Sequence, residues 1–241
     1  MRDLRHYIKL FVPPVLEPPI KKLVRLLDAD WHKRYVGGLW EEIGRVQFDF
    51  LVEQGLTPED YLLDIGCGSL RGGIHFIRYL EPGHYFGVDI SPEILDAAKD
   101  QLKRNELTHK DPILIEMGDF DFRRLRREFD FVLAKGLFTI LPLNSIIRCV
   151  MNVEKVLARE GRFFASMYEN PAGKSNLEPI THPGIDGAST ETAYFDKTPY
   201  HYDFETFKWI CRGTTLNVSY VDNFEHPTEE KLLVFRKEPT P

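Results

Sequence analysis

The chain is poor in cysteine and has no long apolar segment. Its 241 residues include three cysteines, Cys67, Cys149 and Cys211, an odd number without the spacing of metal ligands. This pattern argues against a secreted disulfide framework and against a structural zinc site. No apolar run approaches the roughly 20 residues that a membrane-spanning helix needs. We therefore expect a cytoplasmic protein without a metal site, folded as one domain of ordinary composition.

A strongly basic balance is also absent, although the charge is unevenly distributed. The net charge is -6, which disfavours a general nucleic-acid-coating role. Residues 1–34 nevertheless carry eight Lys/Arg against four Asp/Glu, and the four prolines from Pro13 to Pro19 break any helix there. We expect residues 1–30 to form a basic arm that wraps the domain or a partner subunit, as in a homodimer. Peripheral contact with anionic lipid headgroups is the alternative, because each basic residue near such a surface contributes about 1 kcal/mol.

From residue 61 onward, strand and helix patterns alternate along the chain. Short apolar runs predict strands, and capped amphipathic segments predict the helices between them. The expected strands are 61–65, 84–89, 113–117, 129–134 and 162–167, and the expected helices are 74–80, 91–104 and 144–158. After a long irregular stretch come a short helix over 203–211 and two pairing strands, 214–221 and 231–237. Such alternation predicts an α/β fold: a mostly parallel sheet, helices on both faces and a C-terminal antiparallel hairpin strand.

A glycine-rich turn follows the first predicted strand. Asp64 lies at the end of that strand, and Gly66 and Gly68 follow it before a helix begins. Glycines at such a point let the backbone turn tightly and let a ligand approach closely. Asp89, 21 residues after Gly68, ends the next strand, where a carboxylate can accept hydrogen bonds from ribose hydroxyls. The combination predicts a nucleoside-containing cofactor.

The position of Asp64 separates two classes of cofactor. A carboxylate would repel the pyrophosphate of a dinucleotide, whereas it would attract the ammonium of a methionyl group. The glycine pattern also departs from the dinucleotide fingerprint, because Arg71 stands where the third glycine would be and Gly72 follows it. Both features favour S-adenosylmethionine over NAD.

These motifs resemble those of class I S-adenosylmethionine-dependent methyltransferases. The matching residues are Asp64-Ile65-Gly66-Cys67-Gly68, Gly87-Val88-Asp89-Ile90-Ser91, Gly118-Asp119-Phe120 and Phe129-Asp130-Phe131-Val132-Leu133-Ala134. They fall within residues 58–170, and the terminal hairpin agrees with the reversed seventh strand of the family. The resemblance implies a Rossmann-like sheet of seven strands and a methyltransferase domain over residues 31–241. Within the family, these motifs do not specify the substrate.

The resemblance also implies roles for residues at the methionine and ribose end of the cofactor. Asp64 would fix the methionine ammonium, and Gly66 and Gly68 would leave room for the methionine and ribose. Asp89 would bind the ribose hydroxyls. Arg71 replaces the small residue that is usual in the family, so it would contact the cofactor carboxylate or point to solvent.

Five further residues would border the cofactor according to the same resemblance. Ile90 would lie against the adenine, Asp119 would accept a hydrogen bond from its amino group, and Phe120 would add an apolar contact. Lys135 and Phe138 would border the methionine end. Each has an ordinary alternative, such as a helix cap for Asp119 or core packing for Phe138.

Two segments can cover the C-terminal edge of the sheet, where ligands bind in open α/β folds. The first is the helical segment 31–57, in which Tyr35 and Trp40 flank two glycines and suit a lid over the cofactor. The second is residues 168–202, a loop long enough to be functional, which we expect to hold the substrate. His201 is the first candidate there for a general base and His182 the second. Surface or capping roles are the alternative for both histidines.

The expected function is transfer of a methyl group from S-adenosylmethionine to a hydroxyl or amine of a small-molecule acceptor, leaving S-adenosylhomocysteine. A hydroxyl needs its proton removed, whereas an amine only has to arrive neutral. Nucleic acid is not expected as a partner, because no interleaved aromatic platform accompanies the arginines of 123–127. The alternatives are an NAD(P)-dependent oxidoreductase and a non-catalytic binding or scaffolding protein with the same fold.

Overall fold

The computed structural model describes Asp28 and residues 30–35, 39–170, 176–184, 188–222 and 228–238. The predicted basic arm at residues 1–30 lies almost entirely outside these ranges. The helices are α3 (Trp31–Tyr35), α4 (Trp40–Glu53), α5 (Gly73–Tyr79), α6 (Pro92–Arg104), α7 (Leu143–Glu154) and α8 (Phe204–Cys211), with short 3₁₀ turns η1 (Thr108–Lys110) and η2 (Phe122–Leu125). The strands are β1 (Leu62–Ile65), β2 (Tyr85–Asp89), β3 (Ile113–Glu116), β4 (Phe129–Ala134), β5 (Leu157–Glu169), β6 (Ile180–Pro183), β7 (Thr190–Ala193), β8 (His201–Tyr202), β9 (Leu216–Tyr220) and β10 (Lys231–Lys237).

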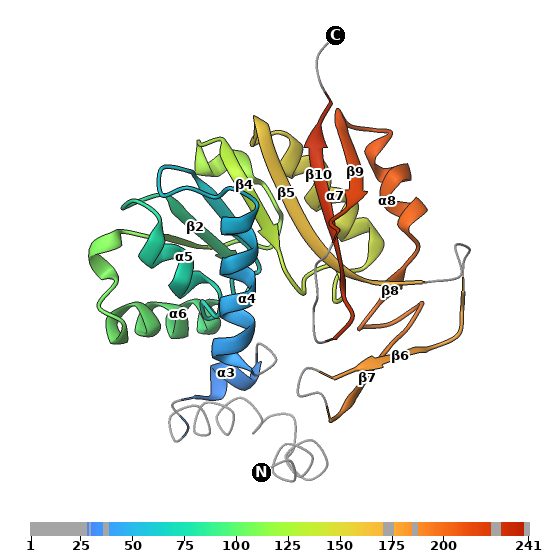
Figure 1. Cartoon of the computed structure of the whole chain (residues 1–241), viewed down its shortest axis with the longest axis horizontal. Helices are drawn as coiled ribbons and strands as arrows, with labels where there is room; N and C mark the ends of the chain where they lie inside the picture. Colours follow the sequence, from blue (N-terminus) through green and yellow to red (C-terminus); the bar gives the residue numbers. More distant parts are fainter. Residues whose placement is uncertain are drawn as a thin grey trace.

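The main sheet has the strand order β3-β2-β1-β4-β5-β10-β9, and β8 pairs with the end of β5 as an eighth strand. Strands β1 to β5 run parallel to one another, whereas β10 runs antiparallel to both β5 and β9 (Figure 1). The β9–β10 pair therefore forms this edge of the sheet, with β10 as the reversed strand. This arrangement confirms the predicted α/β, Rossmann-like and mostly parallel fold.

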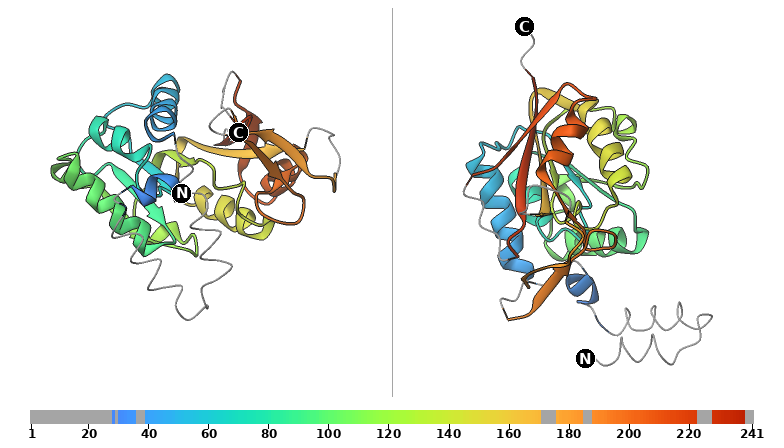
Figure 2. Two further views of the ribbon diagram at one scale, coloured as in Figure 1. Left: turned by 90° about the horizontal axis from the view of Figure 1, so that it is seen from below. Right: turned by 90° about the vertical axis from the view of Figure 1, so that its right-hand side faces the viewer.

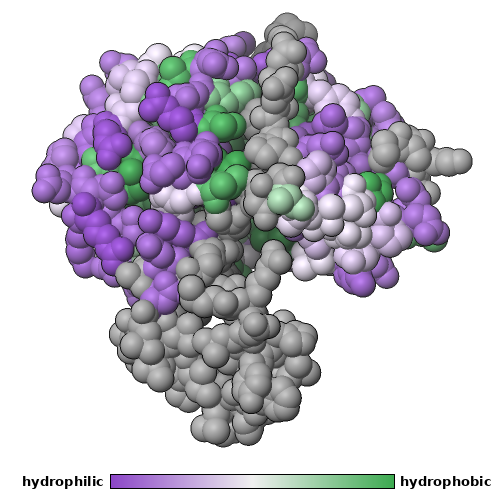
Figure 3. Space-filling model, turned by 60° about the horizontal axis from the view of Figure 1, so that its bottom comes forward, coloured by the Kyte–Doolittle hydropathy of each residue, from purple (hydrophilic) through white to green (hydrophobic). Residues whose placement is uncertain are grey.

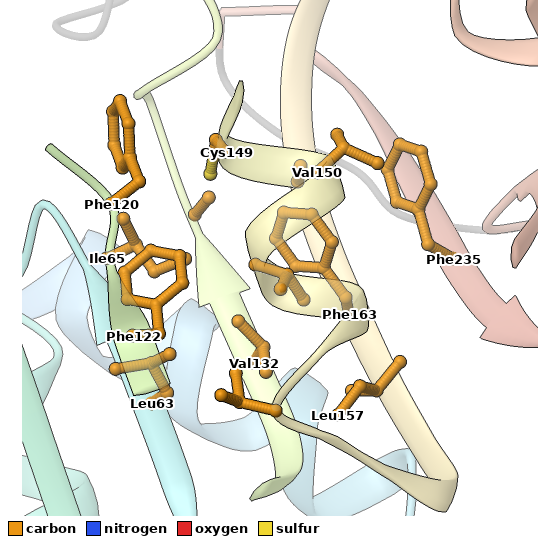
Figure 4. Packing of buried hydrophobic residues seen from close by; sticks show 14 of the residues in the cluster. Leu63, Ile65, Phe120, Phe122, Val132, Cys149, Val150, Leu157, Phe163 and Phe235 are labelled. Atoms are coloured by element: carbon orange, nitrogen blue, oxygen red, sulfur yellow. The ribbon is translucent and has the colours of Figure 1, made fainter. Parts of the chain in front are cut away.

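Helices cover both faces of this sheet (Figure 2). Successive residues of a strand point to opposite faces, so Leu62 and Leu63 of β1 belong to different hydrophobic clusters. The Leu62 cluster joins the sheet to α4, α5 and α6. The Leu63 cluster joins it to α7, α8 and η2, and Figure 4 shows Val132 of β4 and Phe163 of β5 meeting α7 there. Packing on both faces fixes the strands, and with them the residues at the strand ends.

Residues 168–202 differ from the irregular loop that the sequence predicts. The segment contains an antiparallel hairpin of β6 and β7, and then β8, which extends the sheet beside the end of β5. These strands are only two to four residues long, so their alternation is too brief to stand out among the surrounding prolines and glycines. At the other end of the chain, the predicted helical segment is two helices, because α3 ends at Tyr35 and α4 begins at Trp40. Gly37 and Gly38, the two glycines between Tyr35 and Trp40, lie outside the described residues.

Candidate functional site

A cavity of about 790 Å³ opens beside the C-terminal ends of β1, β2 and β4. These parallel strands all end at the same edge of the sheet, which is the lower edge in Figure 1. The hairpin segment around β7 and the residues just before β10 complete the cavity wall. Figure 3 brings this edge forward and shows that its described residues are mostly hydrophilic, with hydrophobic residues in small groups. The cavity therefore lies where ligands bind in open α/β sheets.

The glycine turn after β1 is shaped by two left-handed residues. Gly66 and Gly68 have φ angles of 74° and 57°, which residues with a Cβ rarely adopt. The Gly68 N–H donates a hydrogen bond to Asp89 Oδ2 at 3.1 Å, and the Ser91 N–H donates to Asp89 Oδ1 at 2.9 Å. The turn and the end of β2 thus hold the Asp89 carboxylate in place at the cavity wall.

Asp64 lies at the end of β1 on the same wall. Its carboxylate accepts a hydrogen bond from the buried Tyr85 hydroxyl at 2.6 Å. Burial raises the pKa of Asp64 to about 6; the hydrogen bond from Tyr85 opposes this increase and the charge of Asp89 adds to it. Arg71, also on the wall, lowers it in turn. A carboxylate held there at neutral pH suits a cationic group of a ligand and disfavours a pyrophosphate.

One end of the cavity is apolar and open. Ile90 lines it with 72% of its surface exposed, unusual for an isoleucine, and Met117 and Phe120 lie on the same wall. Gly118 lies between them, and a Cβ there would come 2.9 Å from Ile90 Cδ1. The missing side chain leaves room for Ile90, so the four residues fit a flat aromatic group such as adenine. Asp119 points elsewhere: its side chain is 59% exposed, is paired with Arg124 and does not line the cavity.

Helix α4 packs directly on the turn between β1 and α5. A Cβ on Gly44 would collide with the Arg71 carbonyl, and one on Gly72 would collide with Gln47 Oε1. This close approach brings Gln47 into the cavity wall. Trp40 lies outside the wall, and its ring is nearly perpendicular to that of His32 in α3, with 5.1 Å between ring centroids. Tyr35 ends α3, and its side chain lies outside the described residues.

The opposite end of the cavity is polar. Lys135, just after β4, donates to Glu230 Oε2 at 2.6 Å, and the two side chains are only 5% and 9% exposed. Glu230 also accepts from the Thr228 hydroxyl at 3.1 Å. Burial lowers the pKa of Lys135, while the charge of Glu230 opposes that change. Next to this pair, Tyr168 at the end of β5 donates to Glu191 Oε2 of β7 at 2.8 Å. All five side chains line the cavity.

Three of the predicted site residues lie behind this wall. The His182 ring stacks on Tyr168 with 4.3 Å between centroids, and its Nδ1 is 3.6 Å from Glu229 Oε2. His201 is buried, with Nε2 3.2 Å from the Glu178 carbonyl, and burial lowers its pKa. Phe138 is fully buried and stacks on Phe207 of α8. None of these three side chains lines the cavity.

The cavity also holds residues that the sequence patterns do not single out. Gln47, Glu191 and Glu230 are the clearest examples. Gln47 could have been noticed as a polar residue on the otherwise apolar face of a predicted helix. Glu191 and Glu230 carry no such signal, because the sheet brings them together from distant parts of the chain. Within the described ranges, no group of metal-ligating side chains forms a metal site, and no helix has the length and apolar composition to cross a bilayer.

Comparisons with known sequences agree with this geometry. Residues 63–163 match the family model described as a methyltransferase domain. The 18S rRNA (guanine-N(7))-methyltransferase of Bos taurus is 30% identical over 182 residues, which cover 73% of this chain and 62% of that protein. The chain spans less than two thirds of the length of the first curated relatives that it matches.

Solved structures share the fold along most of the chain. An S-adenosylmethionine-dependent methyltransferase from Clostridium acetobutylicum ATCC 824 has a TM-score of 0.61 at 15% identity, and the match covers 91% of this chain and 99% of that one. The magnesium protoporphyrin IX methyltransferase from Synechocystis PCC 6803, with bound SAM, has a TM-score of 0.57 at 13% identity, covering 98% and 96%. The predicted family resemblance and fold are thereby confirmed.

Proposed function

Because residues 63–163 belong to the methyltransferase-domain family and the chain has the class I fold, we propose that the protein transfers a methyl group from S-adenosylmethionine to a hydroxyl or amine of a small-molecule acceptor. The observation that carries this proposal is the joining of Asp64, the Gly66–Gly68 turn and Asp89 in the wall of one cavity. An NAD(P)-dependent oxidoreductase is disfavoured by the Asp64 carboxylate. A non-catalytic role is disfavoured by the polar end of the same cavity, which a binding module for the cofactor alone would not need.

The residues of the cavity fit the cofactor from end to end. Ile90 and Phe120 would hold the adenine, and the Asp89 carboxylate would accept hydrogen bonds from the ribose hydroxyls. Asp64 would attract the methionine ammonium, and Arg71 would balance the methionine carboxylate. When bound, the cofactor supplies a methyl group on a sulfonium, which is already activated toward displacement. The task left to this chain is therefore to align the acceptor and to exclude water.

The polar end of the cavity is the proposed acceptor site. Four carboxylates line the whole cavity against two basic side chains, Arg71 and Lys135, so an anionic acceptor would be repelled. Lys135 neutralises Glu230. The acidic group left at this end of the cavity is then the Glu191 carboxylate, which accepts a hydrogen bond from the Tyr168 hydroxyl. We therefore infer that the acceptor presents an N–H or O–H group to Glu191. For a hydroxyl acceptor, Glu191 would take the proton as methyl transfer proceeds.

The predicted base candidates would act from behind this wall. His182 stacks on Tyr168 and would fix the direction of its hydroxyl, while His201 bonds to the backbone of residue 178 and would hold the hairpin. Both are proposed here as supports of the acceptor site. Loss of activity in His182→Ala but not in Tyr168→Phe would assign the chemistry to the histidine instead.

Ribosomal RNA is the second candidate for the acceptor, because two relatives, from Bos taurus and Mus musculus, are named as 18S rRNA (guanine-N(7))-methyltransferases. Three of the four arginines in 123–127 already have partners. Arg123 and Arg124 pair with Asp121 and Asp119, and Arg127 lies over the Tyr61 ring at 4.2 Å. These partners compete with phosphate contacts, on which affinity for RNA depends.

Two measurements test the proposal. Calorimetry with S-adenosylmethionine, S-adenosylhomocysteine and NAD should give binding of the first two only, and binding of NAD alone would contradict it. Incubation with methyl-labelled S-adenosylmethionine should then be carried out with small-molecule, RNA and protein fractions of one cell extract. We expect the label in the small-molecule fraction. Label confined to RNA would replace the proposed acceptor class, and no transfer to any fraction would favour the non-catalytic alternative.

A further inference from the structure

A buried histidine joins helix α3 to the glycine turn. His32 is only 2% exposed, although it belongs to a five-residue helix at the surface of the fold. Its Nδ1 is 2.9 Å from Ser69 Oγ, and its Nε2 is 3.1 Å from Gln101 Nε2 in α6. Ser69 and Gln101 are themselves buried. The imidazole thus bridges three elements of the cofactor half of the domain.

The partners of His32 determine its protonation state. The Gln101 side-chain nitrogen can donate hydrogen bonds but cannot accept them, so His32 Nε2 accepts a hydrogen bond from it. The single proton of a neutral imidazole is then on Nδ1 and is donated to Ser69 Oγ. An imidazolium has no acceptor site, so protonation would break the bond to Gln101.

Burial and most of the nearby charges also favour the neutral form of His32. Burial lowers its pKa most, and the positive charges of Lys33 and of Arg104 in α6 lower it further, whereas Asp30 raises it. The Trp40 ring lies nearly perpendicular to the imidazole, and its indole has no nitrogen or oxygen acceptor. The neutral form, which the hydrogen bonds require, is therefore the form present at neutral pH.

The turn that His32 holds is the one that fixes Asp89. Ser69 directly follows Gly68, whose N–H donates to the Asp89 carboxylate. It directly precedes Leu70, a buried residue with a φ of 71°, a backbone conformation that persists only where the surroundings hold it. An undocked α3 would remove one of the side-chain bonds that hold this stretch.

We propose that His32 is a positioning residue for the cofactor: in its neutral form it docks α3 on the glycine turn and keeps the Gly68–Asp89 contact in place. The coupling to the cofactor rests on the proposed function, whereas the docking itself does not. Protonation of His32 releases α3, so cofactor affinity falls as the solution becomes acidic.

The first test is calorimetry with S-adenosylhomocysteine from pH 5.5 to pH 8. His32→Ala should bind roughly tenfold more weakly than the wild type at pH 7.5, and the two affinities should converge as the pH falls and the wild-type imidazole becomes protonated. Ser69→Ala, which removes one partner only, should show a smaller loss of the same kind. His109→Ala is the matched control, because His109 is an exposed histidine that contacts only a backbone carbonyl in its own turn.

Gln101→Glu gives the opposite expectation. A carboxylate at this position would accept a hydrogen bond from an imidazolium, so α3 should stay docked and the affinity should persist to lower pH than in the wild type. A general effect of acid on the cavity would not be reversed by this substitution. Affinity that fell with acid just as in the wild type would contradict the assigned hydrogen bonds.

Docking can also be followed without any cofactor. The chain has three tryptophans, and two of them, Trp31 and Trp40, pack against His32. In a Trp209→Phe background, their fluorescence should change with a midpoint below pH 6.5, and His32→Ala should abolish this transition. Failure of the wild type to bind S-adenosylhomocysteine at any pH would overturn the proposed function and the coupling with it. Intact wild-type binding with equal affinity in His32→Ala would overturn this inference alone.

Discussion

The two ends of the cavity are built in different ways. At the cofactor end, Asp64, Gly68 and Asp89 lie within 26 residues of one another in the sequence, and each follows from the end of a strand or a tight turn. At the acceptor end, Tyr168, Glu191 and Glu230 come from β5, β7 and the residues before β10. The first end is a local motif that its own backbone shapes, whereas the second exists only once the sheet has assembled. Substitutions at the acceptor end should therefore leave cofactor binding intact, whereas methyl transfer at the acceptor end depends on a cofactor bound at the other end.

The largest effect should come from Asp89→Ala. This change removes the proposed ribose contact and strands the Gly68 and Ser91 N–H groups, so S-adenosylhomocysteine should bind about 10- to 100-fold more weakly, equivalent to about 1–3 kcal/mol. Calorimetry measures this directly. Asp89→Asn keeps an acceptor for one N–H group and should lose less. Asp96→Ala in α6 is the control, because Asp96 is exposed and pairs only with Lys99. Wild-type affinity in Asp89→Ala would mean that the ribose lies elsewhere.

Glu191→Gln should separate the two ends. The amide has nearly the same shape but carries no charge and cannot take a proton, so kcat/KM for the acceptor should fall roughly tenfold, equivalent to about 1.4 kcal/mol. The affinity for S-adenosylhomocysteine should stay within about twofold of the wild type, because Glu191 lies at the other end of the cavity. Glu205→Gln, at an exposed glutamate of α8 that pairs with Lys208, controls for the loss of surface charge. A parallel loss of cofactor affinity would contradict the division into two ends.

The same division explains what the sequence could predict. The order of strands and helices follows from short apolar runs and helix caps, and β4 has the predicted bounds, Phe129–Ala134. The Asp64, Gly66–Gly68 and Asp89 set was predictable because each residue lies at or just after the end of a strand, so the backbone itself brings them to one edge. Neither periodicity nor spacing carries information about which distant side chains meet. For this reason Glu230 beside Lys135 and Glu191 beside Tyr168 had to be found in the structure.

The positions of three histidines depend on packing that a sequence does not reveal. His182 and His201 lie in the predicted substrate segment, but β6 and β8, which hold them, place their side chains behind the cavity wall. His32 gave no signal in the sequence, since a histidine in a short polar helix has no periodic context. Its role depends on Ser69 and Gln101, which lie 37 and 69 residues away.

A smaller effect concerns the pH dependence that Asp64 gives to the cofactor end. Its pKa of about 6 is above the usual 3.8 of the unfolded chain, so the carboxylate is charged in the folded protein only above about pH 6. Affinity for S-adenosylhomocysteine should therefore rise several-fold between pH 5 and pH 7 and then level off. Asp64→Asn should bind more weakly at pH 7.5 and lose this rise, whereas the part due to His32 should remain.

The stability of the protein without cofactor should change in the opposite sense. Between pH 3.8 and pH 6 the folded state retains a proton at Asp64 that the unfolded state releases, so this residue contributes less and less stability as the pH rises. Asp64→Asn removes this dependence, so the variant should melt at a higher temperature than the wild type at pH 8. A lower melting temperature would mean that the charged carboxylate is stabilised by its partners more than burial opposes it.

The smallest effect should come from Asp119→Ala. Asp119 is the predicted adenine contact, yet its exposed carboxylate pairs with Arg124 beside the apolar end of the cavity. An exposed ion pair of this kind contributes about 0–1 kcal/mol, so Asp119 could exchange this partner for the adenine amino group at little cost. We expect Asp119→Ala to weaken S-adenosylhomocysteine binding by about two- to threefold. Arg124→Ala, which frees the carboxylate, should tighten it slightly. Equal affinities in calorimetry for the wild type and both variants would instead assign adenine binding to Ile90 and Phe120 alone, and the cofactor end would then depend on shape where the sequence motif predicts a hydrogen bond.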